Sequence, residues 1–237
     1  MEYSSKKGMS KIILVVVAHP DDEVLGCGAS IAKWSALGYS VHVVIMAEGA
    51  TSRDPLRDRN ARVKDLLMLS ESAYRAGEVL SVSSVKILDA PDNRMDSLNL
   101  LDVIKLIEKE VDRLKPHTVV THHGGDLNVD HRIVYDAVIT ACRPLPNFYV
   151  RRLLTFETVS STEWSPPGFN LEFSPNYFED VSKFIDIKIK ALSVYNSEMR
   201  EWPHPRSLDN VKNLAKLRGS SVGMEAAEAF TLLRELK

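Results

Sequence analysis

Hydrophobic positions follow two patterns that alternate along the chain. Short, unbroken apolar runs rich in β-branched residues predict strands that are buried on both faces. They lie at 12–17, 41–47, 85–88 and 118–121. Longer segments with apolar residues at helical spacing predict helices at 24–37, 61–82, 98–115 and 133–142. This alternation predicts an α/β fold with a mostly parallel sheet, because parallel strands need a crossover connection between them.

The C-terminal part of the chain is less regular. Its apolar segments predict strands at 152–156 and 171–173, a largely helical stretch at 177–198, and helices at 211–217 and 224–234. No repeat, low-complexity tract or linker divides the sequence. We therefore expect one domain over residues 1–237, in which the part from 150 to 237 folds back to help form the pocket.

Polar side chains follow the first apolar run, at the point where a buried strand ends. Residues 18–23, which read Ala-His-Pro-Asp-Asp-Glu, supply one imidazole and three carboxylates there. In open α/β sheets, ligands bind in the crevice at the carboxyl ends of the strands. A histidine and an aspartate close together suit zinc, and a neighbouring carboxylate can act as a base on water. This segment by itself predicts a metal-assisted hydrolase.

A second polar cluster, from 122 to 131, also follows a predicted strand and precedes a predicted helix. Both clusters are expected at the same edge of a parallel sheet, so His19, Asp22 and His131 are expected to converge. Two imidazole nitrogens and one carboxylate oxygen resemble the ligands of catalytic zinc, which keeps an open position for water. The sequence therefore predicts a Zn²⁺ site, with another divalent ion as the alternative.

The remaining carboxylates of the two clusters have candidate roles around that metal. Asp21 and its neighbour Asp22 point in different directions, so Asp21 is free to act as the base that takes a proton from water. Asp130 is expected to orient a catalytic or ligating imidazole. For these groups the alternative role is structural, as helix caps or as charges that favour a helix N-terminus.

On these residues the chain resembles the LmbE/PIG-L family of zinc-dependent de-N-acetylases. The resemblance rests on two motifs, 19–23 and 128–131, which occur in this order and each on a strand-to-helix turn. It extends weakly through 91–94 and 204–206. It implies a Rossmann-like three-layer sandwich and hydrolysis of an acetamido group on a sugar, which releases acetate and a free amine. By position in these motifs, the resemblance implies His19, Asp22 and His131 as the metal ligands and Asp21 as the general base.

One position departs from the pattern of this family. Many relatives have a histidine three residues before the last ligand, thought to stabilise the oxyanion or protonate the leaving amine, and here the residue is Asn128. Asparagine can donate a hydrogen bond to an oxyanion, but it cannot be a general acid. The proton for the amine must then come from Asp21, after it has taken one from water, or from another residue such as His122 or His123.

Charged residues on the neighbouring loops are candidates for binding substrate. Arg53 and Arg94 suit hydroxyl, phosphate or carboxylate groups, and Asp92 suits a sugar hydroxyl or a contact with Arg94. Prolines on both sides of His204 fix the local backbone, so that segment can form a wall of the pocket. The substrate-binding candidates are Arg53, Asp92, Arg94, His123, His204 and Arg206. For each of them, a surface or turn residue without contact to substrate is the alternative.

Composition excludes several classes of function. Lysine and arginine number 30 against 32 aspartates and glutamates, so a net charge of −2 argues against a general nucleic-acid-binding surface. No apolar stretch approaches the roughly 20 residues of a membrane-spanning helix, so no integral membrane segment is expected. With two cysteines in the chain, a reducing cytoplasm is the simplest location. The oligomeric state stays open, homo-oligomers included.

Two classes of function are compatible with the motifs. The favoured one is a hydrolase that removes the acetyl group from an N-acetylated amino sugar of the N-acetylglucosamine type, free, nucleotide-linked, lipid-linked, or part of a thiol-sugar conjugate or an aminoglycoside. The alternative is a Rossmann-like module that binds a nucleotide through a divalent metal and has no hydrolase activity. Such a module needs a glycine-rich phosphate loop after the first strand, whereas the carboxylates at 21–23 repel phosphate. An inactive relative is disfavoured because all proposed ligands and the base are present.

Overall fold

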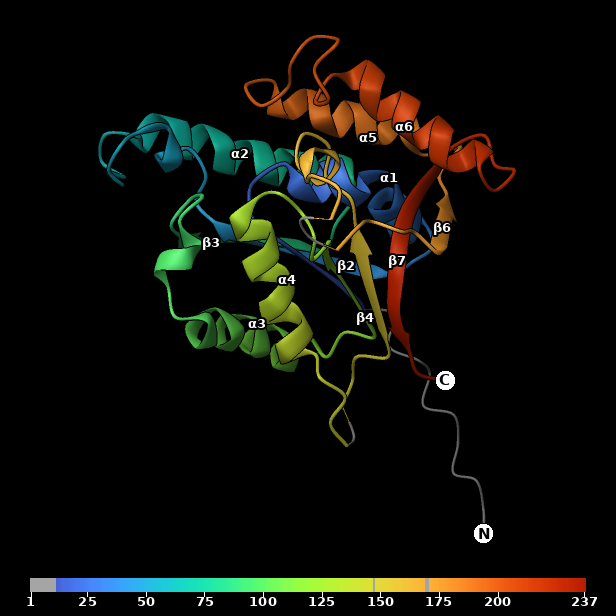
Figure 1. Ribbon diagram of the computed structural model, residues 1–237, viewed down its shortest axis with the longest axis horizontal. Helices are drawn as coiled ribbons and strands as arrows, with labels where there is room; N and C mark the ends of the chain where they lie inside the picture. Colours follow the sequence, from blue (N-terminus) through green and yellow to red (C-terminus); the bar gives the residue numbers. More distant parts are fainter. Residues whose placement is uncertain (1–11, 147, 169–170) are drawn as a thin grey trace.

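The computed structural model describes residues 12–146, 148–168 and 171–237 (Figure 1). Within these ranges the strands form a seven-stranded sheet in the order β3-β2-β1-β4-β5-β7-β6. The strands are β1 (Ile12–Val17), β2 (Ser40–Ala47), β3 (Ser84–Ala90), β4 (Thr118–His122), β5 (Arg152–Phe156), β6 (Tyr177–Asp180) and β7 (Ala227–Glu235). Strands β1 to β5 pair in parallel, whereas β7 runs antiparallel to both β5 and β6. The predicted α/β class with a mostly parallel sheet is confirmed.

Helices cover both faces of the sheet, as Figure 1 shows. They are α1 (Asp22–Ala36), α2 (Val63–Val79), α3 (Leu100–Leu114), α4 (Val129–Ala141), α5 (Ile185–Leu192) and α6 (Leu208–Ser220). Helices α3 and α4 pack on one face, and the other four pack on the opposite face. Alternate residues of β1 enter the two cores, Val15 and Val17 on one side and Leu14 and Val16 on the other. Burial on both sides explains why this strand is apolar without alternation.

The C-terminal part differs from the sequence-based expectation. Residues 224–234 were expected to be helical, but Ala227–Glu235 form β7 between β5 and β6. Hydrogen bonding to two neighbouring strands and burial of Phe230 outweigh the helix propensity of this alanine- and leucine-rich segment. Residues 171–173 are not a strand, and the stretch predicted as largely helical begins with β6.

The strand order places a crevice beside β1. Strands β2 and β4 flank β1 on opposite sides: the chain passes from β1 to β2 and β3 on one side, and then crosses back to β4 on the other side. Ligands of open α/β sheets bind at such a switch point, outside the carboxyl ends of the strands. The segments that follow β1 and β4 emerge together there because these two strands are adjacent and parallel. Among the described residues, no helix has the length and apolar character needed to span a membrane.

Helix α1 is interrupted at Cys27, whose φ of −145° and ψ of 27° are not helical. Glu228 of β7 accepts hydrogen bonds from the freed N–H groups of Ala29 (3.0 Å) and Ser30 (2.6 Å). Lys188 of α5 donates to a backbone carbonyl on the other side of the break, at 2.8 Å. Lys188 Nζ and Glu228 Oε1 lie 2.6 Å apart, and the two side chains are only 6% and 4% exposed. This buried ion pair ties α5 and β7 to the helix that carries the first polar cluster.

Candidate metal centre and active site

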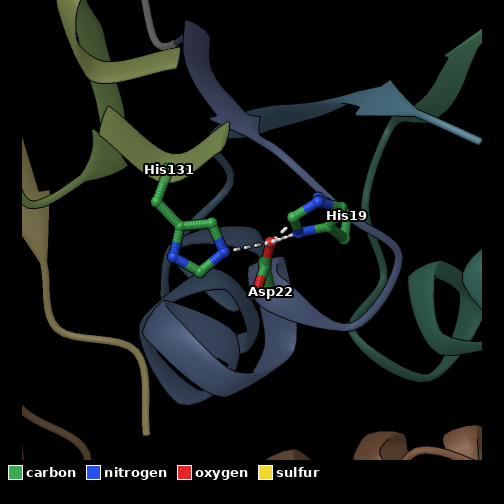
Figure 2. A group of neighbouring side chains, drawn as sticks. All are labelled: His19, Asp22 and His131. Carbon is green, nitrogen blue, oxygen red and sulfur yellow. Dashed lines mark hydrogen bonds and ion pairs between the residues drawn. The ribbon is translucent and has the colours of Figure 1, made fainter. Parts of the chain in front are cut away.

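Three side chains from the two polar clusters meet at the carboxyl ends of β1 and β4 (Figure 2). His19 follows β1, Asp22 begins α1, and His131 lies in the first turn of α4. Asp22 Oδ2 is 3.3 Å from His19 Nδ1 and 3.2 Å from His131 Nε2. Each residue offers one ligand atom, and these atoms all lie within 4.8 Å of one another. The structure thus brings together the residues that the sequence proposed as metal ligands.

Each of the two imidazoles also contacts a second carboxylate through its other nitrogen. Asp130 Oδ2 lies 3.1 Å from His19 Nε2, and Asp126 Oδ1 lies 3.1 Å from His131 Nδ1. Both aspartates are buried. A carboxylate behind a ligating imidazole fixes the orientation of the ring and makes it a stronger ligand. Asp130 therefore orients the imidazole of the other loop, while Asp126, which the sequence analysis missed, holds His131.

The charges of this cluster are mutually dependent. Burial opposes ionisation of Asp22, but His131 holds its pKa well below the ordinary value. Burial likewise lowers the pKa of His131, but Asp22 and Asp126 more than offset this and raise it to about 9. A divalent cation that binds here must displace the proton on the imidazole, so its binding depends on pH.

His122 and His123 are buried next to the site and are held by hydrogen bonds. The ring of His122 stacks on that of His131 with 3.9 Å between centroids, and its Nε2 accepts from the N–H of Ala18 at 2.9 Å. Burial and the neighbouring His131 lower the pKa of His122 to about 3, so the ring is neutral. His123 Nε2 donates to the carbonyl of Leu171 at 2.7 Å. Neither histidine lines the cavity beside His19 and Asp21.

Asp21 is adjacent to Asp22 but has a different environment. Its φ of 106° lies in the left-handed region that residues other than glycine rarely adopt. Arg206 Nη1 donates to Asp21 Oδ2 at 2.6 Å. Burial raises the pKa of Asp21 to about 7, although Arg206 opposes the shift. A carboxylate with this pKa can take up a proton and release it near neutral pH.

Glu23 supports Asp21 from beneath. Its Oε2 accepts from the backbone N–H of Asp21 at 3.1 Å, and its Oε1 accepts from the hydroxyl of Tyr195 at 2.7 Å. Burial raises the pKa of Glu23 to about 8, although the hydrogen bond from Tyr195 opposes the shift. Glu23 therefore holds the unusual backbone turn, while the side chain of Asp21 faces the cavity.

A cavity of about 130 Å³ opens beside His19 and Asp21. The proposed site residues that line it are His19, Asp21, Arg53, Asp92, Asn128 and Arg206. Asn128 Oδ1 caps α4 by accepting from the N–H of Asp130 at 2.8 Å, and its Nδ2 donates to Asn93 Oδ1 at 2.8 Å. Glu198 also lines the cavity and was missed, because it lies in a C-terminal stretch that no local motif connects to the site.

The other proposed substrate-binding residues lie behind this lining. Arg94 Nη2 donates to two backbone carbonyls of the loop after β2, at 2.7 and 3.0 Å, and so holds that loop. His204 Nδ1 accepts from the backbone N–H of Arg206 at 3.0 Å, and its ring lies 6.0 Å from that of Trp164. His123, the first residue after β4, packs edge-on against the ring of Phe173, with 5.3 Å between the ring centroids. These side chains hold the walls of the cavity.

The donor set of the three converging residues fits a divalent metal. Among the described residues, the buried atoms without a well-oriented hydrogen-bond partner include Asp22 Oδ1 and both ring nitrogens of His131. Such groups cost free energy unless a ligand binds them. Two imidazoles and one carboxylate are the donor set of catalytic zinc, whereas magnesium and calcium prefer oxygen ligands alone.

Comparison with known families matches residues 14–142 to PIG-L, described as GlcNAc-PI de-N-acetylase. The match spans more than half of the chain. The chain belongs to the PIG-L family. This PIG-L protein is 32% identical over 199 residues to "Uncharacterized deacetylase YaiS" of Escherichia coli K12, covering 81% of this chain and 95% of that protein. It is 26% identical over 201 residues to diacetylchitobiose deacetylase of Thermococcus kodakarensis, covering 81% and 71%.

Solved structures share the fold of this PIG-L protein. N,N'-diacetylchitobiose deacetylase from Pyrococcus horikoshii aligns with a TM-score of 0.74 at 21% identity, over 94% of this chain and 84% of that one. GalB, the 4-carboxy-2-hydroxymuconate hydratase from Pseudomonas putida KT2440, also aligns with a TM-score of 0.74, at 24% identity over 95% and 97%. The expected Rossmann-like fold is confirmed. The same fold carries a deacetylase and a hydratase, so the reaction must be argued from the site.

Proposed function

We propose that this PIG-L protein is a zinc-dependent de-N-acetylase, which hydrolyses the acetamido group of an N-acetylated amino sugar to acetate and a free amine. The observation that carries the proposal is the convergence of His19, Asp22 and His131 beside a cavity into which Asp21 projects. Zinc held by these three residues supplies Lewis acidity, which polarises the amide carbonyl and makes water a better nucleophile.

Asp21 has the position and the proton affinity of a general base. It lines the cavity, where its carboxylate can accept a proton from the attacking water, and burial raises the proton affinity of this carboxylate. Arg206, at 2.6 Å, fixes the orientation of the carboxylate. The acyl carbon gains the oxygen of water and loses the amine nitrogen, so the amine must receive a proton as the C–N bond breaks.

Asp21 also returns that proton in the mechanism that we propose. Asn128 lines the cavity and keeps an N–H beyond the one donated to Asn93, so it is suited to donate to the developing charge on the carbonyl oxygen. It carries no proton that it can transfer. His122 and His123 do not line the cavity, so the protonated Asp21 is the acid that we place next to the reacting group.

The names of the relatives suggest the class of substrate. Besides the diacetylchitobiose enzyme, they include a 1D-myo-inositol 2-acetamido-2-deoxy-α-D-glucopyranoside deacetylase of Mycolicibacterium gilvum and a probable N-acetyl-α-D-glucosaminyl L-malate deacetylase of Bacillus cereus. The substrates in these names share a 2-acetamido sugar and differ in the group attached to it. We therefore propose an N-acetylglucosamine-type glycoside as the substrate of this chain.

The test is acetate release from N-acetylglucosamine, diacetylchitobiose and other N-acetylglucosaminides, measured after chelation and again after zinc is added. We expect release only with the metal. Asp21→Asn should retain zinc but lose about 10² to 10⁴ in kcat, the range for loss of a general base. His131→Ala should lose both zinc and activity. Asp112→Asn and His117→Ala, which change the same residue types outside the cavity, serve as controls and should behave like the wild type.

Two results would contradict this mechanism. Full activity of Asp21→Asn would remove Asp21 as the base. Stoichiometric zinc in a protein that releases no acetate from any acetamido sugar would support the metal site but exclude the proposed reaction. Turnover of an unsaturated acid by addition of water would then favour the hydratase chemistry of the neighbour GalB.

A further inference from the structure

Both cationic side chains in the cavity wall are already paired with carboxylates. Arg53 Nη2 lies 2.6 Å from Glu198 Oε1, and Arg206 Nη1 lies 2.6 Å from Asp21 Oδ2. Arg53 comes from the loop after β2, whereas Glu198 comes from the segment after α5. The pair therefore joins the N-terminal and C-terminal parts of the chain across the cavity.

The rest of the lining adds carboxylate and neutral polar groups. Asp92 is the third carboxyl group of the described lining, and Ser52, Asn93 and Asn128 supply hydroxyl and amide groups. No lysine lines the described cavity, and neither arginine there lacks a carboxylate partner. Apart from the metal, the walls offer many partners for sugar hydroxyls but no uncompensated cation for a carboxylate or a phosphate.

Glu198 is held firmly in this position. Its side chain is 16% exposed, and its Oε1 also accepts from the hydroxyl of Ser197 at 3.2 Å. Its backbone N–H donates to the carbonyl of Tyr195 at 2.8 Å. The hydroxyl of Tyr195 in turn donates to Glu23, which accepts from the backbone N–H of Asp21. The backbone of Glu198 is therefore tied to the residue that supports the Asp21 turn, and its side chain reaches Arg53 from there.

We propose that Glu198 sets the charge specificity of this enzyme: by neutralising Arg53 it disfavours substrates with an anionic group next to the amino sugar and selects glycosides of uncharged, hydroxyl-bearing groups. The inference rests on the proposed deacetylase function and narrows its substrate class. An anionic aglycone would bring a second negative charge beside Glu198, and like charges brought together at a binding surface oppose association. A neutral sugar ring meets no such repulsion.

The experiment compares two substrates that differ in the aglycone alone, methyl N-acetyl-α-D-glucosaminide and N-acetyl-α-D-glucosaminyl L-malate. The readout is the ratio of kcat/KM for the malate glycoside to kcat/KM for the methyl glycoside. We expect a ratio well below one for the wild type and a rise of about tenfold in Glu198→Gln, which frees Arg53 for the carboxylates. The expected rise is modest because Arg53 is 43% exposed and solvent screens its charge.

Two further variants separate the specific effect from a general change of charge. Glu201→Gln removes a carboxylate at an exposed position three residues further along the chain, and its ratio should equal that of the wild type. Arg53→Gln in the Glu198→Gln background should return the ratio to a low value. Raising the ionic strength should shrink the effect of Glu198→Gln, because salt screens exposed charges.

The outcomes distinguish this inference from the function on which it rests. A wild-type ratio of one or more, an unchanged ratio in Glu198→Gln, or an equal rise in Glu201→Gln would each overturn the charge specificity while leaving the deacetylase intact. Absence of acetate release from every neutral and anionic acetamido sugar would overturn the deacetylase, and the proposed specificity with it.

Discussion

The buried ion pair at the break in α1 makes a stringent test of how this fold is held together. The interruption at Cys27 leaves backbone groups of α1 without helical partners. Lys188 binds a carbonyl before the break, and Glu228 binds two N–H groups after it. Replacing Lys188 with methionine keeps much of the apolar stem but removes the ammonium. Glu228 is then left as a buried carboxylate without its counter-charge, and the carbonyl that Lys188 bound loses its donor.

The magnitude follows from the burial of the pair. The two side chains are 6% and 4% exposed, and removing one partner of a buried ion pair costs about 3–5 kcal/mol. Glu228 keeps the N–H groups of Ala29 and Ser30, so we expect the lower end, about 3 kcal/mol. For a chain of this size each kcal/mol lowers Tm by about 2–4 °C, so Tm should fall by about 6–12 °C.

The assay is urea and thermal unfolding of the full chain, with Lys105→Met as the matched control. Lys105 pairs with Glu108 on the surface, where its side chain is 63% exposed, so its loss should cost less than about 1 kcal/mol. Adding Glu228→Gln to Lys188→Met removes the uncompensated charge and should recover about 1 kcal/mol or more.

Equal stability losses in Lys188→Met and Lys105→Met would refute the reasoning, since burial would then make no difference to the pair. A double variant that loses the full sum of the two single losses would refute it as well. It would show that the two side chains act independently rather than as partners across the break.

Two further predictions follow from close contacts of α1 and α4. A Cβ on Gly26 would lie 2.2 Å from the ring of Phe156, so Gly26→Ala should cost about 1–3 kcal/mol in urea unfolding, the range for overpacking. Asn128→Ala should lose about 1 kcal/mol because Asn128 caps α4, whereas Asn128→Asp keeps an acceptor for Asp130 N–H and should retain stability. Both Asn128 variants lose the amide donor and should lower kcat about 10²-fold.

Each of these predictions has a result that contradicts it. Adding Phe156→Leu to Gly26→Ala should relieve the overlap, so strictly additive losses would contradict the proposed contact. Wild-type kcat in Asn128→Asp would contradict the role of the amide as a donor to the carbonyl oxygen. Equal stability of Asn128→Ala and Asn128→Asp would contradict its role as a helix cap.

Local patterns were sufficient for the β/α core and for the edge of the sheet at which the two polar segments lie. Uninterrupted apolar runs require strands covered on both faces, and parallel strands release their following loops at one edge. Adjacency of β1 and β4 therefore turns two short polar segments, one hundred residues apart, into one cluster around His19, Asp22 and His131. The sequence by itself determined the strands and the shared edge, because these depend only on neighbouring residues and on a general rule of topology, whereas the pairing of β1 with β4 is seen only in the fold.

Tertiary structure alone decided the partners of these residues. Arg206 meets Asp21 across 185 positions, Glu198 meets Arg53 across 145, and β7 becomes a strand because β5 and β6 leave a place between them. None of these pairings leaves a periodic trace in the chain. The energy of a buried charge pair or of a central strand depends on which groups the complete fold brings within hydrogen-bond distance, and local propensity does not contain that information.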